Sequence, residues 1–119
     1  MGKGRLGLTI LASLSFAAAP VQAAQYCVGK ITNVLMYADG RVLIVGTWRG
    51  DYTTICSTQG NFGNIATEVC LSWYGAALKA RADNTNVTIY YPNDGGHTCA
   101  DLLTYGNSPA PEYLLLYST

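Results

Sequence analysis

Four cysteines constrain the fold of this 119-residue chain more than any other feature. They are Cys27, Cys56, Cys70 and Cys99, with 28, 13 and 28 residues between successive members. An even number of cysteines in a short chain is typical of a secreted disulfide framework, whereas structural zinc sites need close pairs such as C-x2-C. The spacing therefore predicts two disulfides, no metal site, no cofactor held by thiolates and no thiol left as a nucleophile.

The N-terminal segment indicates the compartment. Lys3 and Arg5 precede an apolar stretch of about 14 residues, and small residues lead up to Ala23. This pattern is typical of a secretory signal peptide, and its apolar core is too short to span a bilayer. We expect a signal peptide at 1–23, in an alanine-rich form that favours a bacterial source, and one secreted or periplasmic domain at 24–119.

The charge of that domain argues against two classes of partner. Lys3 and Arg5 would leave with the signal peptide, so five basic side chains would face seven acidic ones, a net charge of −2. No run of basic residues remains. A nucleic acid or an anionic membrane surface is therefore disfavoured as a partner.

Hydrophobic periodicity predicts five strands and one helix. Alternating or β-branched runs favour strands at 26–37, 42–48, 52–56, 86–91 and 113–117, and a 3.6-residue period favours a helix over 65–83. We expect a bulge at Gly29, a hairpin turn at Asp39-Gly40, a second turn at 49–51, and helix caps at Asn64 and Asn84. The stretch 93–111 is predicted as a long loop.

Two apolar lines run along the predicted helix. The first predicts the core-facing side: Ala66, Val69, Cys70, Trp73, Ala77 and Ala80. The second, Leu71, Tyr74, Leu78 and Ala82, predicts either cover by the long loop or a contact between subunits of a homo-oligomer.

The helix also suggests how the cysteines pair. Cys70 lies on the core-facing line and Cys56 ends the strand expected beneath it, which favours a Cys56–Cys70 bridge. The remaining pair, Cys27–Cys99, would tie the first strand to the long loop. The other two connectivities remain open at this point.

The element order β-β-β-α-β-β predicts a mainly β fold with one helix. It is the order of an OB-fold-like five-stranded antiparallel barrel. The alternative is an open α+β sheet with one packed helix. Strand order decides between them and is not visible in one sequence.

Residues of the helix and the fourth strand carry a family resemblance. The segments are CLSWY at 70–74, LKARA at 78–82 and NVTIYY at 86–91, behind a secretory leader and an early cysteine. In this respect the chain resembles the B subunits of AB5-type bacterial toxins, such as that of subtilase cytotoxin. The resemblance implies an OB-like barrel, a ring of subunits, a cell-surface glycan as ligand and a secreted toxin-like A subunit as partner. It assigns no ligand-binding residue.

Six side chains at expected strand ends or loops are candidate ligand contacts: Trp48, Tyr52, Tyr91, Asp94, His97 and Tyr105. Aromatic faces beside carboxylates and amides suit sugar recognition, although aromatic residues of a β protein also serve core or edge packing. His97 is the only histidine and the one side chain with an ordinary pKa near neutrality. The alternatives for it are a general base and a solvated loop residue.

These observations favour a non-enzymatic, secreted or periplasmic binding domain whose ligand is a glycan. A small periplasmic inhibitor or protein-interaction domain is the alternative, and a hydrolase using His97 is a minor one.

Overall fold

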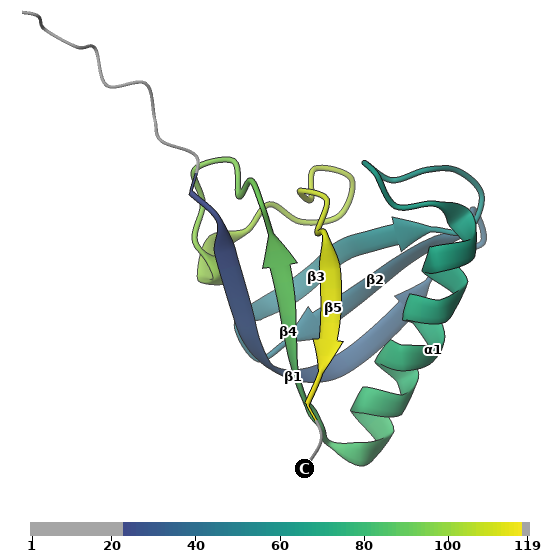
Figure 1. The fold of residues 1–119 in the computed structure, drawn as a ribbon, viewed down its shortest axis with the longest axis horizontal. Coiled ribbons are helices and arrows are strands. Elements are labelled where there is room, and N and C mark those ends of the chain that lie inside the picture. The colour runs from purple at the N-terminus through teal and green to yellow at the C-terminus, as the bar shows by residue number, and fades with distance from the viewer. Residues whose placement is uncertain (1–22, 118–119) are drawn as a thin grey trace, which may run out of the picture.

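The structure, a computed structural model, describes residues 23–117 of the chain. Its elements follow the predicted order β-β-β-α-β-β (Figure 1). The bounds are β1 (Gln25–Met36), β2 (Arg41–Gly46), β3 (Arg49–Ser57), α1 (Thr67–Asp83), β4 (Asn86–Tyr91), the short 3-10 helix η1 (Cys99–Asp101) and β5 (Tyr113–Leu116). Residues 1–22 of the predicted signal peptide lie outside the described residues.

The five strands form one antiparallel sheet in the order β3-β2-β1-β4-β5. The long strand β1 is the centre, because its first half pairs with β4 and its second half with β2. A barrel would require β3 and β5 to pair, and they do not. The mainly β fold with one helix is thus confirmed, but the sheet is not closed into a barrel and is the open arrangement (Figure 1).

The loop after β4 explains why the sheet stays open. Tyr105 in this loop makes a parallel bridge with Thr53, on the outer edge of β3. The Tyr105 N–H donates to the Tyr52 carbonyl at 3.1 Å. The loop therefore occupies the edge that β5 would need in a closed barrel.

Helix α1 packs against β1 and β3. It begins two residues later than predicted: Ala66, not Asn64, holds the N-cap position, and its methyl group cannot accept a hydrogen bond from the first turn. Asn84 ends the helix in the left-handed conformation, as predicted, at φ 54° and ψ 41°.

Both predicted disulfides are present. Cys56 and Cys70 join β3 to α1, and Cys27 and Cys99 join β1 to η1. Three of the four half-cystines are fully buried and belong to one core with the inward side chains of the sheet and helix: Ile31, Val42, Ile44, Ile55, Ile65, Ala77, Ala80, Val87, Ile89, Tyr91 and Leu102. The bridges therefore fasten the helix and the long loop to the same core.

The bulge in β1 lies further along the strand than predicted. The register shifts between Ile31 and Asn33, not at Gly29. Because one extra residue exchanges the two faces of a strand, Val34 packs against the core after the bulge, whereas Leu35, which an unbroken alternation from Ile31 would place inward, does not.

The turn between β2 and β3 is also displaced. It is made by Thr47 and Trp48, and the residues 49–51 that predicted a turn belong to β3. Trp48 fills the space left by the absent side chain of Gly46, which permits the tight reversal.

The two apolar lines of α1 do not divide into a core-facing and an outer line as predicted. Val69, predicted to face the core, is exposed, as are Leu71 and Leu78 of the second line. Tyr74 of the second line is half-buried and packs against the core. Within residues 23–117 no helix is long and apolar enough to cross a membrane.

Candidate functional site

Tyr91, a predicted ligand contact, is not exposed. It ends β4 and is fully buried, because β4 is covered on this face by the core of the domain. Its hydroxyl has no hydrogen-bond partner of good geometry among the described residues, and a weak interaction with Thr53 offsets only part of the effect of burial on its pKa. Burial raises the pKa of Tyr91 to about 12. The sequence prediction of an exposed aromatic at 91 is therefore wrong.

Asp94 and His97 serve the loop itself. Asp94 is 3% exposed, and its Oδ1 accepts a hydrogen bond from the Gly96 N–H at 2.8 Å. The half-buried His97 has its Nδ1 3.9 Å from Asp101 Oδ2. Two hydrogen bonds from Thr98 to Asp101 Oδ1 lower the pKa of the Asp101 carboxyl. The histidine thus lies beside an aspartate that already caps η1.

Trp48 lies at the tip of the β2–β3 hairpin and is half-buried against the core. Its indole ring covers Gly46 and approaches Gly29. The indole N–H is buried without a hydrogen-bond partner in the described part of the chain. Most of its apolar surface therefore serves packing.

Tyr52 and Tyr105 are the two predicted ligand residues that the fold brings together. Tyr52 comes from β3 and Tyr105 from the loop beside it, with ring centroids 6.1 Å apart and planes inclined at 47°. Asn33 of β1 donates from Nδ2 to the Tyr52 hydroxyl at 3.3 Å. Two tilted aromatic rings and an amide thus share one surface.

The backbone of Tyr105 is held firmly in place. Its carbonyl accepts hydrogen bonds from the Thr54 hydroxyl at 2.8 Å and the Ser108 hydroxyl at 2.9 Å. The Ser108 hydroxyl in turn accepts the Thr54 N–H at 2.9 Å. Both Thr54 and Ser108 are buried, so water does not compete strongly for these bonds.

Tyr105 adopts an unusual backbone conformation. Its φ is +51°, a left-handed value that costs a non-glycine residue of order 1 kcal/mol or more. Such conformations persist where the surroundings enforce them, and they gather at sites of ligand contact. The anchoring bonds to Thr54 and Ser108 supply that enforcement here.

The Tyr105 hydroxyl remains a donor across the physiological pH range. Loss of hydration raises the pKa of Tyr105 above its usual value, and the nearby carboxylate of Asp51 adds to the increase. Tyr105, a residue that is 39% exposed, therefore offers a protonated hydroxyl at the surface.

Asn33 and Asp51 lie beside Tyr52 and Tyr105, but the sequence analysis did not predict them as site residues. Asn33 comes to the surface only because of the bulge before it, and Asp51 was assigned to a turn. A polar residue inside an otherwise apolar strand was the one signal available for Asn33.

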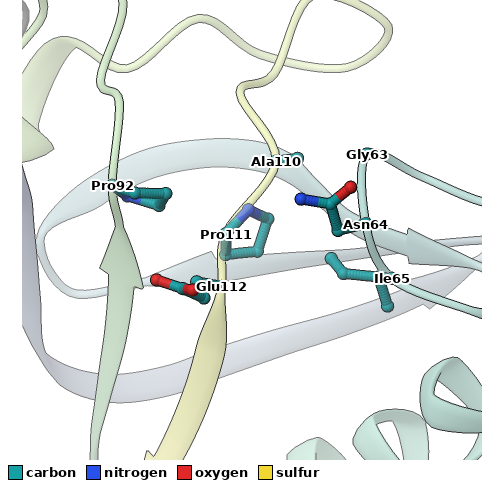
Figure 2. A pocket seen from close by; sticks show the side chains of 7 residues that line it. All are labelled: Gly63, Asn64, Ile65, Pro92, Ala110, Pro111 and Glu112. Atoms are coloured by element: carbon teal, nitrogen blue, oxygen red, sulfur yellow. The ribbon is translucent and has the colours of Figure 1, made fainter.

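Three hollows lie elsewhere on the molecule. Figure 2 shows one of about 350 Å³, where Glu112 and Pro92 face Asn64 and Ile65 across Pro111. A second, of about 360 Å³, contains Asp94, and a third, of about 560 Å³, lies beside the end of α1. Neither Tyr52 nor Tyr105 lines any of these three hollows.

No group of metal-ligating side chains occurs between residues 23 and 117.

Scans of protein-family models, of curated proteins and of solved structures each found no match to this chain.

Proposed function

We propose that this chain is a secreted or periplasmic, non-catalytic domain that binds a saccharide at the Tyr52–Tyr105 surface. The observation that carries the proposal is the anchored, left-handed Tyr105 beside Tyr52. The exposed Tyr105 and the half-buried Tyr52 offer apolar ring surface to the C–H groups of a sugar, and the neighbouring Asn33 and Asp51 offer polar groups to its hydroxyls. The two disulfides are compatible with an oxidising compartment.

A glycan array with the disulfide-bonded protein tests the proposal. We expect a defined saccharide preference, and we expect Tyr105→Ala to weaken binding by about tenfold or more, the usual cost of losing a buried aromatic contact. Tyr113→Ala is the matched control, because Tyr113 is also 39% exposed but lies on β5. A protein that prefers no saccharide, or equal losses in the two variants, would reject the assignment.

A second candidate, a protein-interaction domain, is favoured by the outer face of β1, β4 and β5. Tyr26, Tyr90 and Tyr113 stack across the three strands, with centroid separations of 4.8 and 5.1 Å. Val28 and Leu115 continue this face and are about half exposed. Strand β5 also has no partner on its outer edge in the described sheet, and such edges accept strands from other chains.

The two candidates differ in what they predict for one variant. If the β5 edge were the working surface, Leu115→Lys would abolish association with a protein partner and leave the array unchanged.

A subunit contact through Leu71, Tyr74 and Leu78 is a further proposal for α1. It gains support from the exposure of Leu71 and Leu78, and light scattering of the protein measures it directly.

A further inference from the structure

The largest of the three hollows lies between the C-terminal end of α1 and the middle of β1. Its lining comes from β1, the β2–β3 turn and the end of the helix: Lys30, Ile31, Thr32, Thr47, Arg81, Ala82 and Asn84. Five of these seven residues carry a side-chain hydrogen-bond donor, and none carries a carboxylate. This composition differs from that of the other two hollows, which contain Glu112 and Asp94.

The two cations of this hollow lack acidic partners. Arg41 and Lys79 are bound to Asp39 and Asp83, each at 2.9 Å. By contrast, Lys30 and Arg81 have no carboxylate within 4.0 Å anywhere in residues 23–117. Two cationic residues that line one hollow without a carboxylate favour an anion there over a cation.

Arg81 is held in position before any ligand arrives. Its Nε donates to the Thr32 carbonyl at 2.9 Å, which joins the last turn of α1 to β1. Its terminal nitrogens make no hydrogen bond with the described residues. A guanidinium fixed in this way keeps donors for a planar or tetrahedral oxyanion at little further loss of entropy.

The opposite wall of the hollow is equally fixed. The Lys30 N–H donates to Thr47 Oγ1 at 3.1 Å, and the Thr47 N–H donates to the Lys30 carbonyl at 2.9 Å. Residue 29 must be glycine for this approach, since a Cβ there would overlap Thr47 Oγ1. The hydroxyl proton of Thr47 remains available to a ligand.

One local charge opposes an anion. The end of a helix carries about half a negative charge, and α1 ends at this hollow. The two full positive charges exceed it. The nearest carboxylate along the helix, that of Asp83, is bound to Lys79.

We propose that this hollow binds an anionic group, a carboxylate, sulfate or phosphate, between Lys30 and Arg81. The site shares no residue with the Tyr52–Tyr105 surface and does not depend on the saccharide proposal. The competing explanation is that Arg81 only links the helix to β1.

Titration of the isotope-labelled, disulfide-bonded protein by NMR tests the proposal. The probes are sodium sulfate, phosphate and acetate, with sodium chloride at the same ionic strength as the reference. We expect saturable shifts of the amides of Lys30, Thr47 and Asn84. A sulfated and a carboxylated monosaccharide then show whether a sugar-borne group binds more tightly than the free ion.

The variants separate the two explanations. Lys30→Gln and Arg81→Gln should each weaken anion binding by about tenfold, the usual effect of one charge-assisted hydrogen bond. Lys79→Gln, on the same helix but outside the hollow, and Tyr105→Ala should leave it within about twofold. Lys30→Gln keeps the test valid if Arg81→Gln disturbs the fold, because Lys30 makes its structural bonds through the backbone.

The proposal fails if no anion gives saturable shifts up to about 10 mM, a concentration that covers weak specific sites. It also fails if Lys79→Gln weakens binding as much as Lys30→Gln does.

Discussion

At the scale of single residues, Tyr91 shows how much chemistry depends on burial that the sequence does not display. It precedes Pro92 at the end of a strand, where an exposed ring is a reasonable expectation. The core instead closes over it and leaves its hydroxyl without a hydrogen bond. A buried hydroxyl without a partner costs about 1–3 kcal/mol.

Tyr91→Phe should therefore raise the free energy of unfolding by about 1 kcal/mol at neutral pH. Urea unfolding measures this change, and Tyr26→Phe is the control, because the Tyr26 side chain is largely exposed. A loss of stability in Tyr91→Phe would show that the hydroxyl has a hydrogen-bond partner after all.

The same variant has a signature at high pH. The pKa of Tyr91 is about 12 in the folded domain and 10.0 for an ordinary tyrosine, so the unfolded chain loses this proton first. The contribution of this raised pKa to the free energy of unfolding is complete below pH 10. It disappears as the pH rises towards 12, a change of about 3 kcal/mol. Tyr91→Phe should lack this part of the alkaline decline.

At the scale of elements, local periodicity predicted the kind and order of the strands and the helix. Periodicity did not predict the positions of the bulge in β1 and of the β2–β3 turn, where a shift of a few residues changes which side chains face the core. The bulge after Ile31 exchanged Leu35 for Val34 on the inner face, and the turn moved to Thr47 and Trp48. Such shifts depend on how strands pair, which a single strand does not encode.

The N-terminus of α1 offers a test of capping. Ala66 already has the extended backbone of an N-cap, at φ −74° and ψ 158°, but no oxygen to accept a hydrogen bond. Ala66→Ser should stabilise the domain by about 1 kcal/mol in thermal or urea unfolding. Ala82→Ser, near the other end of the helix, should cost a few tenths of a kcal/mol. Equal effects from both changes would contradict the assignment of Ala66 as the cap.

At the scale of the whole molecule, the two disulfides join α1 and the long loop to the sheet. The pairing was predictable because Cys70 lies on the inward side of a helix and only one pair then remains. The contact between Tyr52 and Tyr105, and the hollow that Lys30 and Arg81 both line, bring together segments about 50 residues apart. No periodicity links such segments, so neither site was visible in the sequence as an assembly.

Removing the Cys27–Cys99 bridge should loosen the long loop and with it Tyr105. The bridge spans 72 residues, which corresponds to about 4 kcal/mol in the chain-entropy account, against about 3 for the 14-residue span of Cys56–Cys70. In a Cys27→Ala, Cys99→Ala variant, the Tyr105 amide should exchange its hydrogen faster. In the matching Cys56→Ala, Cys70→Ala variant, the Tyr105 amide should exchange no faster than global unfolding of that variant requires. Faster exchange of the Tyr105 amide in this second variant than in the first would contradict the expectation.

The two bridges are also nested along the chain, with Cys56–Cys70 inside Cys27–Cys99. A chain that crosses a membrane from its N-terminus exposes Cys27 first and its native partner last, after both other thiols. Pairing in order of emergence would join Cys27 to Cys56, and thiolate exchange would then have to correct it over seconds to hours. If the domain is exported, as we propose, its maturation would depend on the arrival of its final cysteine, and on an isomerase wherever oxidation is faster than export.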